Sequence, residues 1–315
     1  MRIGAERLLF AGSTNPDDVE DQLKAWTALL TAPGYRPEWK EKFLDGIKAS
    51  FHTIGSTPRG VAARDLGRIW ANGDRRFGYV EQSEYEAVTI EDVRSVLAPI
   101  LRDGAVEIGI VGDFDKEAVI AAVAKTYGAL PMRRAFFDPH ASAFDLDFPE
   151  PERVTLTHTG ADNLGEIYLT WPTTQTWTVP NTRHYSLIQV IFNNRMKEII
   201  REDMGLSYSP RASVRYDKNN VDYGYMTASM SSAPKHFAAF EKAVKDIAAD
   251  LRSGGITQDE VERARKPLVE RYNRALTENS DWVRLITESQ TKPEVLDWRR
   301  TRTSAYEAMT PESLD

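Results

Sequence analysis

The sequence feature that most constrains the fold is an internal repeat with a fixed spacing of 221 residues (304 minus 83). SEYEAVTIEDV, which begins at Ser83, and SAYEAMTPESL, which begins at Ser304, share Ser, Tyr, Glu, Ala, Thr and a second Glu without a gap. The same spacing aligns further apolar helix positions upstream: Leu23 with Val244, Trp26 with Ile247, and Leu30 with Leu251. A helical pattern that stays in phase over this length predicts two homologous domains.

The two copies differ at their ends. Residues 153–225 of the second copy have no counterpart in the first, and residues 104–131 of the first have none in the second. We therefore expect a first domain at 1–131 that lacks its front portion, a proline-rich linker at 132–152, and a second domain at 153–315 that lacks its final strand and helix. This pattern favours a piece of a longer protein; the alternative is two domains that diverged at their ends.

Composition narrows the possible functions. The chain has 315 residues, which suits about two domains. Its net charge of −7, from 40 basic and 47 acidic residues, argues against nucleic-acid binding as the main activity. The absence of Cys excludes disulfides, thiolate zinc sites, iron–sulfur clusters and a Cys nucleophile. No stretch approaches the ~18–20 apolar residues of a membrane span, and MRIGAERLLFAG lacks the features of a signal peptide.

Local patterns predict an α+β fold in which each unit is an antiparallel sheet with helices packed on one face. The predicted helices of the first copy cover Pro16 to Gly34, 37–51, 60–71, 90–101 with Thr89 as the N-cap, and 116–130. Its predicted strand covers 106–114. The second copy is expected to have strands in RVTLTHTG, GEIYLTWP, 206–216 and 221–231, a helix capped by Thr182, and a helix at 234–251 that Gly254 and Gly255 end.

Several catalytic motifs are missing from the sequence. Neither H-E-x-x-H nor H-x-x-E-H occurs. No two imidazoles have the spacing that places them on one helix face; the five are His52, His140, His158, His184 and His236. Phosphate-binding glycine loops and the G-x-S-x-G elbow are also absent. The sequence alone thus provides no local start for a zinc, nucleotide or serine-hydrolase site.

One corner, REDMGLSYS at 201–209, has two interpretations. In the structural one, Gly205 takes the left-handed position just past a helix end. Arg201 then stabilises the helix dipole, and Tyr208 lies in a strand. In the functional one, Arg201 and Tyr208 are hydrogen-bond donors aimed at a ligand, and Gly205 turns the chain between them.

The sequence around this corner resembles a known family. NNRMKEIIREDMGLSYSPRASV is similar to the pitrilysin/insulysin family of zinc metallopeptidases, the inverzincins, in which a helix ending N-R-(L/M)-x-x-x-(L/I)-R-E runs into G-L-x-Y-S. VGDFDKEAVIAAVAKTYGALP resembles the strand and helix that close a family domain, and GITQDEVERARKPLVERY resembles a family helix start. Because these segments touch both copies of the repeat, the resemblance covers most of the chain.

The resemblance implies a fold and a function. Large family members have four homologous α+β domains in two halves that close around a peptide, and only the amino-terminal half carries H-x-x-E-H and zinc. The chain then corresponds to the carboxy-terminal half of a zinc-dependent endopeptidase, inactive alone. Arg201 and Tyr208 would be transition-state donors, Ser207 and Ser209 substrate contacts, and Gly205 a structural residue. Strand 221–231 would neighbour the substrate groove.

Partners and location follow from the same resemblance. The expected partners are a peptide or small protein substrate and the amino-terminal half or catalytic subunit that binds zinc. Zinc is therefore expected in the full-length enzyme and not in this chain. The implied location is the periplasm, with the cytoplasm as the alternative. A second possibility is a non-catalytic homologue that serves as a scaffold or peptide-binding subunit of a two-subunit peptidase or complex, like the core subunits of the mitochondrial cytochrome reductase.

Overall fold

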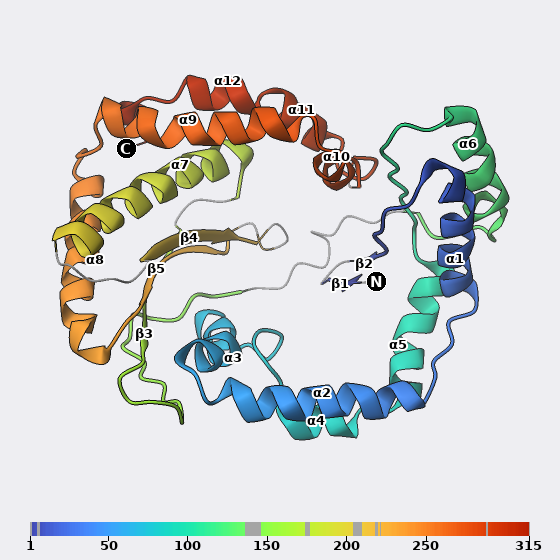
Figure 1. The fold of residues 1–315 in the computed structure, drawn as a ribbon, viewed down its shortest axis with the longest axis horizontal. Coiled ribbons are helices and arrows are strands. Elements are labelled where there is room, and N and C mark those ends of the chain that lie inside the picture. The colour runs from blue at the N-terminus through green and yellow to red at the C-terminus, as the bar shows by residue number, and fades with distance from the viewer. Residues whose placement is uncertain are drawn as a thin grey trace. The chain divides into compact units, whose positions relative to one another are not determined.

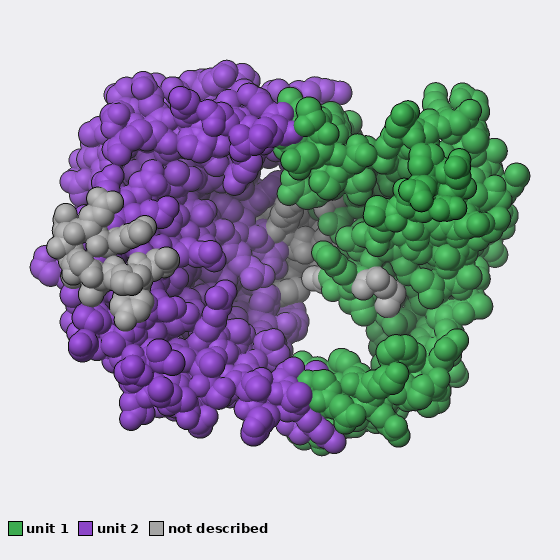
Figure 2. All heavy atoms as spheres, viewed as in Figure 1, with its two compact units in different colours: residues 1–46, 83–142, 275–297 green, residues 47–82, 143–274, 298–315 purple. Residues whose placement is uncertain are grey.

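The computed structural model of the protein describes residues 2–4, 7–135, 146–173, 177–203, 210–217, 220, 222–287 and 289–314, without the side chains of residues 201–203. The chain forms two compact units that interleave along the sequence (Figure 2). The first unit comprises residues 1–46, 83–142 and 275–297, and the second comprises 47–82, 143–274 and 298–315. The domain boundaries expected from the repeat remain a prediction.

The second unit is built on a three-stranded antiparallel sheet in the order β3–β5–β4. The strands are β3 (Glu166–Pro172), β4 (Arg211–Tyr216) and β5 (Gly224–Ser231). Central β5 pairs with both neighbours, so that Thr227 lies opposite Thr170 on one side and Ser213 on the other. Each strand falls within a stretch for which the sequence predicts a strand.

Two helices cover one face of this sheet (Figure 1). They are α7 (Val179–Met196), which continues as the π-helical segment η4 (Lys197–Asp203), and α8 (Phe237–Arg252), which follows the short η5 (Pro234–His236). Alternate residues of β5, such as Ala228 and Met230, contribute to the core between sheet and helices. The predicted antiparallel sheet with helices on one face is thus confirmed in this unit.

Helix α7 is covered on its other side as well. A second buried cluster joins it to α9 (Gln258–Ala275), α12 (Arg302–Glu307) and the residues on either side of η6 (Pro311–Ser313), Met309 and Leu314. Leu187 and Ile191 of α7 lie in this cluster and are almost completely buried. Helix α3 (Pro58–Trp70) also belongs to the second unit and contacts β3.

The first unit is mainly helical. A two-residue pairing of β1 (Arg2–Ile3) with β2 (Leu8–Leu9) precedes η1 (Pro16–Asp18) and α1 (Val19–Thr31). Helix α1 packs on α5 (Ile90–Asp103) and α6 (Lys116–Lys125), which η2 (Tyr127–Ala129) follows. The remaining helices are α4 (Gln82–Ala87), α10 (Asn279–Ile286), and parts of α2 (Glu38–Ile54) and α11 (Glu294–Arg300). None of the described helices is long and apolar enough to cross a membrane.

The repeat in the sequence is also a repeat of helices. Shifted by 221 positions, α1 covers 240–252, where α8 spans Phe237–Arg252, and α2 covers 259–275, where α9 spans Gln258–Ala275. Helix α4 falls in the same way on α12. The start signals repeat too, because Thr89 and Thr310 both form capping boxes.

A similar side-chain contact occurs in both copies, although its donors stand one turn apart in the repeat, because Lys40 corresponds to Val261 rather than to Arg265. The backbone oxygen of Glu86 accepts a hydrogen bond from Lys40 at 3.2 Å. Its counterpart in the second copy, the backbone oxygen of Glu307, accepts one from Arg265 at 2.9 Å. In both copies a basic residue of the long helix therefore holds the end of the short helix, so α2 packs against α4 as α9 packs against α12.

Two of the predicted strands are not formed. Residues 106–114, predicted as a strand, form none, and RVTLTHTG at 153–160 forms no strand either. A strand requires a partner backbone, and the described residues supply none for either segment. In place of a ladder, Thr159 donates its backbone N–H to Gly55, and the segment that holds Gly109 packs against Ile286.

Several helix boundaries also differ from the prediction; α6, for example, ends at Lys125 and not at 130. Helix α7 starts one turn before Thr182, because Thr178 is its N-cap and accepts a hydrogen bond from the backbone N–H of Asn181. Thr182 lies inside the helix and donates its hydroxyl to the backbone oxygen of Val179. Helix α1 ends at Thr31, before Gly34. The predicted end of α8 is confirmed, with Gly254 in the left-handed region at φ 78°.

Candidate functional site

The corner between α7 and β4 holds the residues that the sequence singles out. The backbone of Arg201 lies in η4, and β4 begins at Arg211. The Arg201 side chain and the positions of Gly205, Ser207, Tyr208 and Ser209 lie outside the described residues. Their predicted roles as donors, substrate contacts and turn therefore stay predictions, and the structure defines only the frame on which the corner is mounted.

A half-buried amide, that of Asn193, joins the two sides of this frame. The Asn193 side chain on α7 accepts a hydrogen bond from the backbone N–H of Ala212 at 2.7 Å and donates to the Ala212 oxygen at 3.1 Å. It also donates to the Gln189 oxygen at 2.9 Å, and Gln189 itself donates to Ala212 at 3.2 Å. Ala212 is buried. Both polar groups of its backbone are thus tied to α7, which fixes where the chain re-enters the sheet after the corner.

We expect Asn193→Ala to lower the free energy of unfolding by about 2 kcal/mol, because it removes three hydrogen bonds and leaves buried backbone groups of Ala212 without these partners. Chemical denaturation monitored by circular dichroism measures this change. Asn194→Ala is the matched control: it makes the same substitution at the next position of α7. A loss no larger than that of the control would show that Asn193 does not brace the corner.

Arg195 forms a second brace on the same helix. Its guanidinium contacts Glu260 at 2.7 Å and 3.1 Å, Asp250 at 2.5 Å, and the backbone oxygen of Gly255 at 2.5 Å. The Arg195 and Glu260 side chains are only 13% and 15% exposed. This network links α7 to the end of α8 and the start of α9.

The charges in this network influence one another. Hydrogen bonds from Arg195, and next from Thr257, overcome the opposing effect of burial and lower the pKa of Glu260 to about 2. The same hydrogen bonds from Arg195 to Glu260 raise the pKa of Arg195. Glu260 also accepts hydrogen bonds from the backbone N–H and the hydroxyl of Thr257, both at 2.9 Å, and its own N–H donates to that hydroxyl. This is a capping box at the start of α9.

The sheet face opposite α7 and α8 is polar. Register and alternation place Arg211, Ser213 and Arg215 of β4 on this face, and all three are exposed. In the middle row, Ser213 lies opposite Thr227, and Thr227 lies opposite Thr170. The Thr170 and Thr227 hydroxyls are buried without a hydrogen-bond partner among the described residues. Such groups mark a place where a ligand or water completes the hydrogen bonding.

Aromatic rings cover part of this polar face. Trp70 of α3 lies 4.7 Å from the Tyr225 ring and 6.2 Å from the Tyr168 ring, measured between centroids. Phe148 lies 6.0 Å from Tyr225. Burial raises the pKa of Tyr225, against the opposing effect of the nearby Arg215 guanidinium. The face therefore has an aromatic wall at one end and two arginines along its β4 edge, a combination that suits peptide carbonyl and carboxylate groups.

The described residues do not fit a zinc site. No group of three metal-ligating side chains is found in this part of the chain. His158 has a structural explanation: one ring nitrogen lies 3.0 Å from the Leu164 backbone oxygen, and the other accepts the Gly160 N–H at 3.1 Å.

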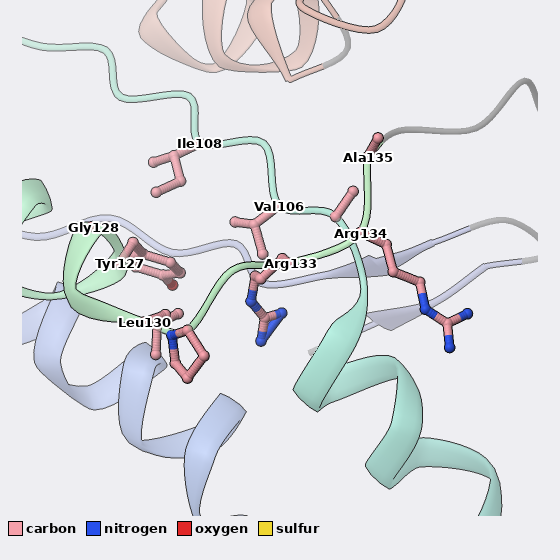
Figure 3. A pocket seen from close by; sticks show the side chains of 10 residues that line it. Val106, Ile108, Tyr127, Gly128, Leu130, Arg133, Arg134 and Ala135 are labelled. Atoms are coloured by element: carbon pink, nitrogen blue, oxygen red, sulfur yellow. The ribbon is translucent and has the colours of Figure 1, made fainter.

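The first unit contains a surface pocket of about 450 Å³, shown in Figure 3. Val106, Ile108, Tyr127 and Leu130 give it a largely apolar lining. Arg133 also lines it, but its guanidinium is engaged by the backbone oxygens of Leu101 and Gly104 at the end of α5. It therefore caps a helix, and the lining lacks a pair of groups suited to acid–base or nucleophilic chemistry.

Sequence reasoning missed the two braces and the polar face. Asn193 and Arg195 both lie inside the quoted motif NNRMKEIIREDMGLSYS, so the signal was present, but their partners Ala212 and Glu260 are remote in sequence. The Thr170 and Thr227 hydroxyls, which lack a partner in the described part of the chain, lie opposite each other through the register of two strands, and strand patterns alone do not set that register.

Fold and site together define an α+β protein with an internal repeat, two side-chain braces on α7 and a polar sheet face. The family model described as Peptidase M16 inactive domain matches residues 87–268, which is more than half of the chain. The chain belongs to this family.

Known relatives agree with this assignment. The chain is 24% identical over 330 residues to the chloroplastic stromal processing peptidase of Pisum sativum; the match covers 87% of this chain and 26% of the relative. The chain thus spans about a quarter of the length of the curated relatives it matches. Among solved structures, a protease from Helicobacter pylori matches with a TM-score of 0.72 and 13% identity, over 96% of this chain and 73% of that one. A peptidase M16 inactive domain from Pseudomonas fluorescens matches with a TM-score of 0.68 and 16% identity, over 95% and 70%.

Proposed function

We propose that the chain is the carboxy-terminal half of a zinc-dependent endopeptidase, in which it binds the peptide and supplies hydrogen-bond donors to the reacting carbonyl. The zinc belongs, in this proposal, to an amino-terminal half or a catalytic subunit. The observation that carries the proposal is the polar sheet face, with Arg211, Arg215 and two buried hydroxyls that have no partner among the described residues, in the same unit as the Asn193 and Arg195 braces. Membership of the M16 inactive-domain family supports it.

The proposed roles divide between binding and catalysis. Arg211 and Arg215 hold carbonyl or carboxylate groups of an extended peptide along the sheet face. Arg201 and Tyr208 donate to the oxygen that gains negative charge as the peptide bond is attacked. Asn193 and Arg195 position the corner that carries these donors. Placing donors and metal in separate halves makes catalysis depend on closure around the substrate. We propose the periplasm as the location, with the cytoplasm as the alternative.

The purified chain tests this division of roles. We expect zinc well below one ion per chain by elemental analysis, and no cleavage of a fluorogenic peptide, because the donors alone do not activate a water molecule. We also expect it to bind an unstructured acidic peptide, and the double variant Arg211→Ala/Arg215→Ala to weaken that binding. The control is Arg252→Ala/Arg263→Ala, which removes two arginines from outside the sheet. Stoichiometric zinc together with proteolysis would contradict the proposal. An equal loss of peptide binding in the two double variants would contradict it as well.

A non-catalytic scaffold or peptide-binding subunit is the second candidate. The absence of a metal-ligating group among the described residues is compatible with it. Restoration of proteolysis by a zinc-bearing half distinguishes the two candidates, since a scaffold would bind that half without raising its turnover through Tyr208.

A further inference from the structure

The first unit exposes apolar side chains at positions whose counterparts in the second unit are buried. Phe43 of α2 is 54% exposed, whereas Ala264, 221 residues further on, is completely buried. Val88 is 45% exposed, whereas its counterpart Met309 is buried. Helix α2 has no buried residue along its whole length, whereas α9 buries three. The first unit therefore repeats a helical platform without burying its apolar face.

In the second unit, α7 covers the equivalent face. Leu187 and Ile191 of α7 belong to the same buried cluster as Ala264, Tyr306 and Met309. The helices beneath have the same order and spacing in both copies, and in each a basic residue of the long helix, Lys40 or Arg265, donates to the last turn of the short helix. In the first unit, none of the described helices buries Phe43 or Val88 in this way.

The two units differ in charge at the positions that bind Arg195 in the second unit. In the second unit, Asp250 and Glu260 pair with Arg195 of α7. Their counterparts in the first unit are Leu29 and Trp39, which are 47% and 59% exposed. The position that receives a guanidinium in the second unit is therefore apolar in the first. A charged residue buried there would lack a partner and would weaken binding.

We propose that Leu29, Trp39, Phe43, Tyr85 and Val88, which we name the α2 platform, bind an amphipathic helix of a polypeptide segment outside residues 1–315. This helix lies on α2 and α4 as α7 lies on α9 and α12. It carries aliphatic residues at the positions of Leu187 and Ile191, and an uncharged aliphatic residue at the position of Arg195. A patch of this kind is typical of an interaction surface, and this one does not depend on the proposed peptidase function.

A peptide from α7 provides the probe. The peptide spans residues 178–200 with Arg195→Leu, carries a fluorescent label, and is titrated with the intact chain while anisotropy is measured. We expect it to bind at least tenfold more tightly than the peptide of native sequence, because its leucine contacts Leu29 and Trp39. We also expect Phe43→Asp in the chain to weaken binding at least tenfold. Since Phe43 is exposed, this variant is expected to fold.

Val96→Asp is the matched control, because Val96 is 62% exposed on α5 and lies outside the α2 platform. It should leave peptide binding unchanged. Equal affinity of the two peptides, no binding, or an equal effect of Phe43→Asp and Val96→Asp would overturn the proposal. Sedimentation gives a further test: a dimer that Phe43→Asp dissociates, without peptide binding, would assign the platform to a second copy of the chain. A second copy would have to use a surface other than its own α7, because its Leu187 and Ile191 are buried in its own core.

Discussion

Tyr208→Phe is expected to lower the kcat of the assembled peptidase by about 10²–10³, the effect of losing one hydrogen-bond donor to an oxyanion. The substitution removes only the phenol hydroxyl and keeps the ring, so the corner between α7 and β4 should fold as before. The loss should fall on kcat more than on KM, since the donor acts on charge that develops only in the transition state. Steady-state kinetics with a peptide substrate, in the presence of the zinc-bearing half, measures both constants.

Tyr79→Phe is the matched control for this experiment. Tyr79 precedes α4 in the sequence, its ring contacts Phe51, and the substitution again removes only a hydroxyl. It should leave kcat unchanged. If Tyr208→Phe also leaves kcat unchanged, Tyr208 has only the structural role of a strand residue. A comparable loss in both variants would indicate a general effect on folding, which circular dichroism of each variant would detect.

Arg195→Ala is expected to lower the free energy of unfolding by up to about 3–5 kcal/mol, the range for removing one partner from a buried ion pair, because this pair is largely buried. Glu260 would keep its charge in a site that is largely closed to water, and the Gly255 backbone oxygen would lose its donor. Three elements meet at Arg195, namely α7 and the neighbouring ends of α8 and α9, so the loss should appear as global unfolding at lower denaturant concentration. Urea denaturation provides the measurement.

Two controls separate this effect from simple loss of charge. Arg263→Ala removes an arginine of α9 whose pairs with Glu198 and Asp259 are exposed, and such pairs contribute about 0–1 kcal/mol. The second control is pH. Because the pKa of Glu260 falls from its usual 4.5 to about 2 on folding, its contribution is present above pH 4.5 and is lost as pH falls toward 2. The difference between native protein and Arg195→Ala should therefore shrink over that range. Equal losses for both arginines would contradict the proposed brace.

The sequence predicted those parts of the fold whose signals are local. The Thr89 capping box starts α5 where expected, and Gly254 follows the end of α8. The prediction of a strand at 106–114 was wrong, because a run of β-branched residues does not show whether a partner strand is present. The start of α7 was misplaced because two threonines, Thr178 and Thr182, stand one turn apart and both make cap-like bonds. Only the Thr178 hydroxyl accepts an N–H of the first turn.

The candidate site was less accessible to sequence reasoning. Motif resemblance identified the corner, and its frame is present in the structure. The residues that hold the frame could not be recognised, because Asn193 and Arg195 act through partners that only folding brings near. The repeat indicated that residues 153–225, which contain α7, have no counterpart in the first copy. Which side chains are left uncovered became visible only when the exposure of Phe43 was compared with that of Ala264.

The π-helical turns of η4 change the relation between sequence spacing and side-chain direction at this corner. A π turn takes one more residue than an α turn to close each hydrogen-bonded ring, so a helical wheel drawn through α7 loses its phase after Met196. The angular position of Arg201 about the helix axis therefore cannot be extrapolated from Leu187 and Ile191. Deleting one residue within Lys197–Asp203 would restore the α-helical phase and change the orientation of everything that follows, although the motif letters would remain almost intact.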